Sequence, residues 1–428
     1  MMPEVIHRSA DVFGIGRELP LNYVERKSVD NIFVESLTRD KHLVIYGSSK
    51  QGKTSLRKTW LKDDEHIVVS CTNTMSVSDL NAAILKGAGY KVELSDAKSV
   101  SGEFKVTAEF KGKGKVPLIA ELEGGASVEH QSGRESEVVR ARLELDLQDV
   151  NDIVAALKEI DFTQYVVLED FHYLPIETQQ NFAFSLKTFH ENSATCFIVV
   201  GVWREKNRLV YYNGDLTSRV VAIDADGWSK DELAEVIRVG GNLLNVTFHP
   251  DFVSGVLENA FDAVYLVQEA CLKACEEAEV YQTGDDNVVV GEGLDAKAII
   301  RDIVGEQAGR YTAFITNFAE GFQKSGLEMY KWLIHAVINS ERERLEVGLR
   351  RTDVAAAIKA VHPEGQGLNE GNITQALQNT ASLQVLKKVR PIILDYDQTT
   401  RVLSVVDRSF LIWLAHQDNS ELLAELAL

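Results

Sequence analysis

Apolar and polar residues follow two different periods along the chain, and their alternation predicts the fold. Short apolar runs typical of buried parallel strands occupy residues 42–46, 66–70, 165–168, 196–200 and 220–223. Apolar positions at helical spacing fall between them, over residues 29–37, 55–61, 77–85, 150–160 and 177–189. Because parallel strands need a crossover connection, usually a helix, this alternation predicts an α/β core with a parallel sheet over residues 15–225.

Residues 90–147 interrupt this rhythm. Two runs, residues 104–110 and 116–123, alternate between apolar and polar positions on either side of a Lys-Gly-Lys-Gly-Lys segment. They predict a β-hairpin insertion that is polar on one face, followed by a solvated stretch over residues 124–140. Because the insertion lies outside the α/β pattern, it is a reasonable place for a partner to bind.

After the core the pattern becomes helical and predicts three further regions. A helical lid is expected over residues 226–283, and a linker with a helix over residues 284–325. Residues 326–428 begin with three helical segments, which are followed by two strands within residues 386–396 and 401–406. Three helices and a β-ribbon predict a C-terminal winged-helix domain.

Composition narrows the protein class without naming a function. The 428 residues carry a formal net charge of −19, which argues against a protein that coats nucleic acid with its whole surface but allows one basic patch. No apolar run reaches the ~18 residues of a membrane span, and residues 1–14 lack the apolar stretch of a signal peptide. The four cysteines include Cys271 and Cys275, one helical turn apart, which we interpret as buried thiols. A cytoplasmic protein without a membrane partner is expected.

A phosphate-binding motif stands between the first predicted strand and its helix. The segment matches G-x-x-x-x-G-K-[ST] and consists of Gly47, Ser48, Ser49, Lys50, Gln51, Gly52, Lys53 and Thr54, with Ser55 directly after it. The glycines let backbone N–H groups turn toward phosphate oxygens, and the helix presents its N-terminus to the same anion. Lys53 would neutralise the β- and γ-phosphates, and the Thr54 hydroxyl would ligate magnesium. The motif therefore predicts a P-loop that binds ATP with Mg²⁺.

Two acids end a neighbouring predicted strand, where a P-loop site needs a carboxylate for the metal. Sites of this kind usually place an Asp first, for the metal, and a Glu second, to activate the attacking water. This chain has Glu169 followed by Asp170. Either the roles follow position, or Asp170 holds the metal and hydrolysis is weakened. Both acids are thus candidates for metal binding and for catalysis.

Two arginines are further candidates, each with a structural alternative. Arg204 follows the strand after the acids, where a γ-phosphate sensor would stand, but it would serve equally as a surface charge. Arg219 precedes the last core strand and could reach a neighbouring subunit's γ-phosphate as an arginine finger. Its alternative role is a local ion pair with Asp215. The finger would make the protein a homo-oligomer.

These segments together resemble the AAA+-like ATPases of the origin-recognition and STAND groups. The resemblance starts at Tyr23-Val24-Glu25-Arg26, and it implies that Tyr23 lies near the adenine. It continues through the P-loop and the segment 169–174, which looks like the family's D-E-x-H-x-L, and it extends to Arg219 and the lid, over about residues 15–280. The chain departs from the family in the reversed acids, in lacking a polar sensor, and in having no arginine within residues 260–265. The family also carries a winged helix, which either reads DNA or packs on the ATPase core.

The predicted winged helix leaves both of those roles open. Its third helix would offer side chains that can contact base edges, namely Asn372, Thr374, Gln375, Gln378 and Asn379. Lys387, Lys388 and Arg390 beside the ribbon are candidates for phosphate contacts. However, residues 342–408 hold 10 Lys and Arg against 8 Asp and Glu, a balance of only +2, whereas a duplex reader normally has a basic face.

Three functions follow from these expectations. The first is an ATP-driven switch that assembles and acts through a separate effector or partner protein. The second is a helper or loader ATPase that binds DNA through the winged helix. The third is an ATP-binding scaffold that does not hydrolyse the nucleotide. The motifs do not choose among them.

Overall fold

The computed structural model describes residues 5–16, 18–94, 105–113, 138–322 and 327–426. Its core is a parallel sheet in the order β2-β6-β7-β1-β8, built from β1 (His42–Tyr46), β2 (His66–Ser70), β6 (Tyr165–Glu169), β7 (Phe197–Val200) and β8 (Val220–Asp224). Every pairing in this sheet is parallel. The expected α/β sheet is therefore confirmed, and β1, which leads into the P-loop, lies between β7 and β8.

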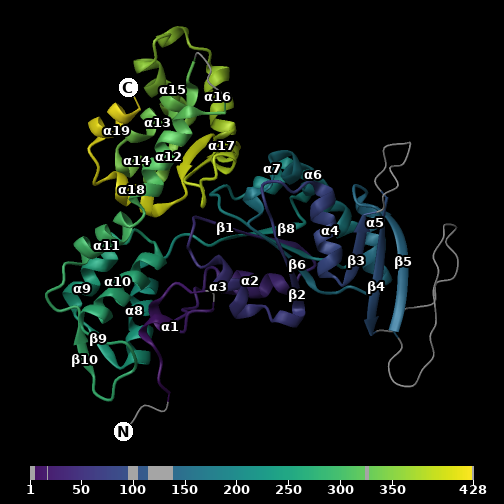
Figure 1. The fold of residues 1–428 in the computed structure, drawn as a ribbon, viewed down its shortest axis with the longest axis horizontal. Coiled ribbons are helices and arrows are strands. Elements are labelled where there is room, and N and C mark those ends of the chain that lie inside the picture. Colours follow the sequence, from purple (N-terminus) through teal and green to yellow (C-terminus); the bar gives the residue numbers. More distant parts are fainter. Residues whose placement is uncertain (1–4, 17, 95–104, 114–137, 323–326, 427–428) are drawn as a thin grey trace.

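Helices cover both faces of the sheet, because the side chains of its strands alternate between two apolar layers. On one face Val44, Val166 and Val199 pack against α4 (Val77–Gly87), α5 (Val150–Glu159) and α6 (Ile176–Asn192). On the other, Leu43, Val167 and Ile198 pack against α2 (Asp30–Leu37) and α3 (Lys53–Trp60). Figure 1 shows these two layers around the central strands.

The insertion is a three-stranded antiparallel sheet, where we expected a hairpin. Its order is β3-β4-β5, formed by β3 (Tyr90–Leu94), β4 (Lys105–Lys113) and β5 (Val138–Asp146). The expected second strand, residues 116–123, and most of the expected solvated stretch lie outside the described residues. The expectation is wrong for residues 138–140, which form the start of β5. Tyr90 ties the sheet to the core by donating a hydrogen bond to Ala156 O at 2.8 Å.

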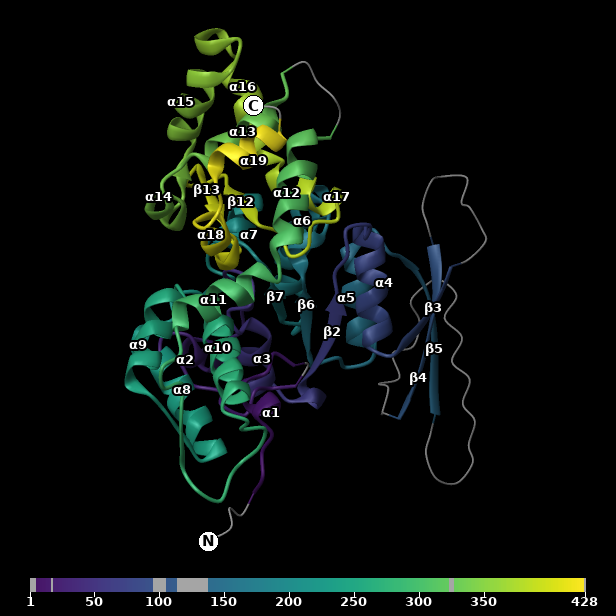
Figure 2. The same ribbon diagram turned by 60° about the vertical axis from the view of Figure 1, so that its left-hand side comes forward.

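The lid follows the last core strand at the opposite end of the molecule from this insertion (Figures 1 and 2). It contains α8 (Lys230–Leu244), α9 (Pro250–Asn259), α10 (Val264–Glu277) and α11 (Ala296–Gly305). The short helix α1 (Ser9–Phe13) packs against α8 and α10. A parallel pair joins β9 (Val246–Phe248), within the expected lid, to β10 (Val288–Val290), in the segment that was expected to be a linker. Helix α8 begins at a capping box formed by Ser229 and Glu232.

The C-terminal region has three helices followed by a β-ribbon, the order of elements that the winged-helix prediction requires. Helix α12 (Ala308–Glu320) leads into it. Three helices, α13 (Met329–Ile338), α15 (Arg351–Val361) and α16 (Glu370–Gln378), precede a ribbon of β12 (Leu394–Asp397) and β13 (Val402–Val405). The antiparallel sheet has the order β11-β13-β12, with β11 (Leu349–Arg350) at one edge. Helices α14 (Arg342–Val347), α18 (Arg408–Leu414) and α19 (Asn419–Glu425) complete the region.

One expected strand segment in this region is wrong. Residues 386–389, expected as part of a strand, form instead the end of helix α17 (Thr380–Leu386) and the turn after it. This segment, Leu-Lys-Lys-Val, is too short for periodicity to distinguish a strand from a helix. The turn reverses the chain at Lys388, whose φ is 61°.

The winged helix lies against both the lid and the core, as Figures 1 and 2 show. A small apolar cluster joins Val202 of the core to Val385, Ile392 and Val406 of the winged-helix region. Within the described residues, no helix is long and apolar enough to cross a bilayer.

Candidate nucleotide-binding site

The P-loop has the backbone that its motif requires. Gly47 has φ 139° and Gly52 has φ 81°, values that residues with side chains rarely adopt. A Cβ atom at Gly47 would also come within 3.0 Å of Asp226 Oδ1. Gly52 is the N-cap of α3, so the loop delivers the chain to a helix N-terminus, where N–H groups favour an anion.

Lys53, the motif lysine, is buried within its own loop. Its Nζ donates hydrogen bonds to Gly47 O at 3.0 Å and to Ser48 O at 2.5 Å. Burial lowers the pKa of Lys53 to about 8, although Asp226 and Glu169 oppose that shift. The ammonium is thus held inside the cradle by carbonyl oxygens, which a phosphate could replace.

The hinge between core and lid clasps the P-loop, a feature that sequence reasoning missed. Asp226 accepts two hydrogen bonds from Ser48, one from its N–H at 2.6 Å and one from its hydroxyl at 2.9 Å. Two residues further on, Trp228 Nε1 donates to Gln51 O at 3.4 Å, and the Arg26 guanidinium stacks over its ring at 4.2 Å. The P-loop is therefore hydrogen-bonded directly to the first residues of the lid.

A cavity of about 330 Å³ runs from the P-loop to the N-terminal segment and the lid. The P-loop residues Ser49 to Ser55 line one end, together with Glu169 and Asp170. Tyr23 lines the same cavity, and its hydroxyl donates a hydrogen bond to Asp30, while burial raises its pKa. The cavity thus brings together the P-loop, both acids and Tyr23.

A buried amide pair, Asn22 and Gln268, also lines this cavity, and no sequence motif pointed to it. Asn22 Nδ2 donates to Gln268 Oε1 at 2.7 Å, and Gln268 Nε2 donates to Asn22 Oδ1 at 3.0 Å. The pair links the N-terminal segment to α10 of the lid. Sequence reasoning could not find it, because the two residues are 246 positions apart.

The two acids differ in their surroundings. Glu169 ends β6, and its Oε1 accepts a hydrogen bond from Arg57 Nε at 3.0 Å in an ion pair with little exposure. Asp170 follows in a left-handed conformation with φ 59° and is exposed. Burial raises the pKa of both carboxyls, and Arg57 opposes the shift at Glu169, as Lys53 does at Asp170.

These surroundings decide how well the site fits magnesium. The described residues contain no group of three or more His, Cys, Asp or Glu side chains that could hold a metal ion by themselves. Thr54 and Asp170 offer oxygen atoms at the P-loop end of the cavity. The Glu169 carboxylate, in contrast, is already neutralised by Arg57. The cradle fits a polyphosphate well, and it fits magnesium only through Thr54 and Asp170.

The two candidate arginines do not line the cavity. Arg204 Nη1 donates to Glu346 O in the winged-helix region at 2.9 Å, and its Nε lies 3.9 Å from Asp226 Oδ2. Arg219 is ion-paired with Glu191 at 2.7 Å. The expected ion pair between Arg219 and Asp215 is wrong, because Arg219 contacts only the backbone carbonyl of Asp215, whose carboxylate pairs with Lys187.

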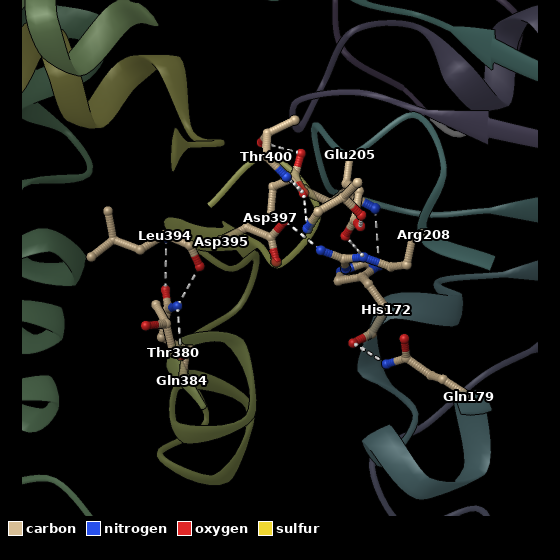
Figure 3. A network of polar contacts seen from close by, with 12 residues as sticks. His172, Gln179, Glu205, Arg208, Thr380, Gln384, Leu394, Asp395, Asp397 and Thr400 are labelled. Carbon is tan, nitrogen blue, oxygen red and sulfur yellow. Dashed lines mark hydrogen bonds and ion pairs between the residues drawn. The ribbon is translucent and has the colours of Figure 1, made fainter. Parts of the chain in front are cut away.

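The winged helix touches the P-loop through its backbone. Ser49 N–H donates to Val406 O, directly after β13, at 3.0 Å. Figure 3 shows a second contact, in which Arg208 of α7 (Arg208–Tyr212) lies between Asp395 of β12 and Glu205. The Nη2 of Arg208 is 2.6 Å from Asp395 Oδ2, and its Nε is 3.3 Å from Glu205 Oε2. Both contacts bind the winged helix to the core.

The candidate nucleic-acid contacts are partly engaged within the chain. Lys387 pairs with Glu320 at 2.8 Å, and Arg390 Nη2 donates to Asn73 Oδ1 at 2.7 Å. Arg390 also stacks on Tyr173, 4.8 Å from the ring centre. Lys388 is exposed, and so are Gln375 and Gln378 of α16, whereas Asn372, Thr374 and Asn379 are partly buried. Two of the three cations thus already contact protein groups.

No family model matches this chain, and no curated protein matches it. Several solved structures are similar to this chain at a low level. The Walker-type ATPase paby2304 of Pyrococcus abyssi is 13% identical, with a TM-score of 0.44 over 92% of this chain and 99% of that one. The Aeropyrum pernix Orc1 protein, solved in complex with DNA, is 11% identical, with a TM-score of 0.45 over all of both chains. Cdc6p from Pyrobaculum aerophilum is 12% identical, with a TM-score of 0.38 over 97% of this chain and 98% of that one. Likeness at this level assigns no function to this chain.

Proposed function

We propose that the protein is an ATP-binding molecular switch, in which the nucleotide site controls the position of the winged helix. The P-loop backbone, the buried Lys53 ammonium and the N-terminus of α3 together suit a polyphosphate. The cavity extends from that cradle to Tyr23 and the lid, which leaves room for a nucleoside. If magnesium, which the motif implies, accompanies the nucleotide, Thr54 and Asp170 would hold it.

The backbone hydrogen bond from Ser49 N–H to Val406 O carries this proposal. It joins the P-loop to the winged helix without an intervening side chain. A ligand that rearranges the P-loop must therefore either keep this contact or break it. A difference in affinity between the two arrangements is what a ligand needs in order to shift their populations.

Assembly into a homo-oligomer that recruits a separate protein partner completes the proposed switch. Arg219 supports assembly only in part, since it is half-buried and paired with Glu191, so it would have to exchange this partner to act on a neighbour. The winged helix would contact protein in preference to DNA, because Lys387 and Arg390 are engaged within the chain.

The test is particle mass in solution, measured with ATP, with ADP and without nucleotide, for the wild type and for Lys53→Ala, alongside phosphate release. We expect ATP to produce a discrete oligomer in the wild type alone. A monomeric mass in every condition, with no phosphate release, contradicts assembly.

A non-hydrolysing ATP-binding scaffold is the second candidate. The pairing of Glu169 with Arg57 favours it, because an acid held by a guanidinium is a poor proton acceptor. Tight ATP binding without phosphate release, and with a mass that Asp170→Asn does not change, would identify the scaffold.

A further inference from the structure

Arg57 occupies an unusual place for a cation. It lies four residues after Lys53 on α3, so both side chains lie on one face of the helix, one turn apart. From there its Nε donates to Glu169 Oε1 at 3.0 Å, and the two side chains are only 8% and 16% exposed. Glu169 holds the first position of the acid pair, which in P-loop sites serves the metal.

A chain of hydrogen bonds fixes Arg57 in this position. Lys62 O can only accept, so His66 Nδ1, 2.6 Å away, must carry the proton. His66 Nε2 is then an acceptor, and Arg57 Nη1 donates to it at 2.8 Å. The guanidinium is therefore directed at two acceptors at once, the imidazole and the Glu169 carboxylate.

This arrangement changes the charge that a metal ion would meet. A divalent cation is held at a P-loop by phosphate oxygens, a hydroxyl and the charge of the neighbouring acid. At Glu169 that charge is already balanced by a buried cation, which a dication would have to approach or displace. Since like charges repel strongly where solvent is scarce, Arg57 works against a metal at Glu169.

We infer that Arg57 stands in for the charge of magnesium at Glu169, so that ATP binds with little dependence on Mg²⁺. Glu169 is then the ion-pair partner of Arg57 and does not ligate a metal ion. Asp170 is the acid that remains unpaired with Arg57 beside the bound nucleotide. This inference rests on the proposed nucleotide site.

The experiment measures ATP affinity by calorimetry in excess Mg²⁺ and in excess EDTA. For the wild type we expect the two affinities to agree within about threefold, whereas Arg57→Gln, which keeps hydrogen-bond donors but removes the charge, gains at least about tenfold from Mg²⁺. Arg57→Lys keeps the charge and should behave as the wild type does. Arg57→Gln combined with Glu169→Gln removes both charges, so it should lose the acquired Mg²⁺ dependence.

A wild type that loses tenfold or more of its affinity in EDTA overturns the inference, even where Arg57→Gln does not fold. An Arg57→Gln protein that folds and shows no gain from Mg²⁺ overturns it as well. Lys53→Ala separates this failure from that of the proposed function. If ATP binding by the wild type depends on Mg²⁺ and Lys53→Ala abolishes it, the proposed nucleotide site stands and the inference about Arg57 alone fails. If the wild type does not bind ATP in either condition, both fail.

Discussion

The burial of Lys53 makes phosphate binding in the proposed site sensitive to pH. Its pKa of about 8 means that the free protein loses this positive charge as pH rises above 8, and a bound polyphosphate would raise the pKa again. Binding above pH 8 then takes up a proton, so we expect ATP affinity to fall by up to about tenfold per pH unit between pH 8 and 10. Calorimetry at pH 7, 8 and 9 measures this.

Lys53→Arg is the matched control for that prediction. A guanidinium stays charged over this range, so whatever affinity the variant retains should not change with pH. An equally flat profile in the wild type would show that Lys53 does not meet the phosphates.

At the scale of elements, the joint between α8 and the P-loop depends on Asp226. Replacing it with Ala leaves the Ser48 N–H and hydroxyl, on a fully buried residue, without their acceptor. We expect Asp226→Ala to lower the free energy of unfolding by about 2 kcal/mol, and Asp226→Asn by less, because the amide oxygen still accepts one of these bonds. Urea denaturation measures both.

Asp231→Ala serves as the control for this joint. Asp231 is an exposed residue in the first turn of the same helix, so its loss removes mainly a favourable interaction with the helix dipole, worth about 0.5 kcal/mol. Equal effects of the two alanine variants would mean that Asp226 does not hold the P-loop.

At the scale of the whole molecule, the Arg208 network determines how firmly the winged helix is attached to the core. Arg208 and its partners Glu205 and Asp395 are each at most 7% exposed. Arg208→Met leaves two buried carboxylates without a cation, which typically costs about 3–5 kcal/mol. We expect this variant to open the interface, seen as a larger radius of gyration in solution scattering.

Removing one of these two carboxylates should reverse part of that opening. In the double variant Arg208→Met/Asp395→Leu, only one of the two carboxylates is left without a cation. The radius of gyration should therefore return toward the wild-type value. Arg238→Met removes an exposed pair with Glu235 and is the control expected to change nothing. If Arg238→Met increased the radius of gyration as much as Arg208→Met does, the buried network would not be what holds the interface closed.

Assembly is the other property that belongs to the whole molecule. If Arg219 acts on a neighbouring subunit, Arg219→Ala should lower phosphate release at least about tenfold and leave ATP affinity unchanged. Glu191→Gln removes the ion pair that holds Arg219, so this variant should release phosphate faster than the wild type. Phosphate release that is equal in all three proteins would leave Arg219 as a structural residue.

The sequence by itself determined what is encoded by neighbouring residues. The parallel strands follow from apolar periodicity and the turn of the P-loop from glycines at residues 47 and 52, and the structure has both. Local patterns failed where they were ambiguous. Residues 138–140, the start of β5, were expected in a solvated stretch, and residues 386–389, at the end of α17 and in the turn after it, were expected in a strand.

Tertiary structure alone decided the electrostatics of the site. Glu169 and Arg57 are 112 residues apart, Asp226 and Ser48 are 178 apart, and Val406 reaches Ser49 from the far end of the chain. Such pairs leave no periodic signal, because nothing in the neighbourhood of either residue depends on the other until the chain has folded. The motif could therefore predict that phosphates are bound, whereas only the folded arrangement shows which carboxylate is still available beside them.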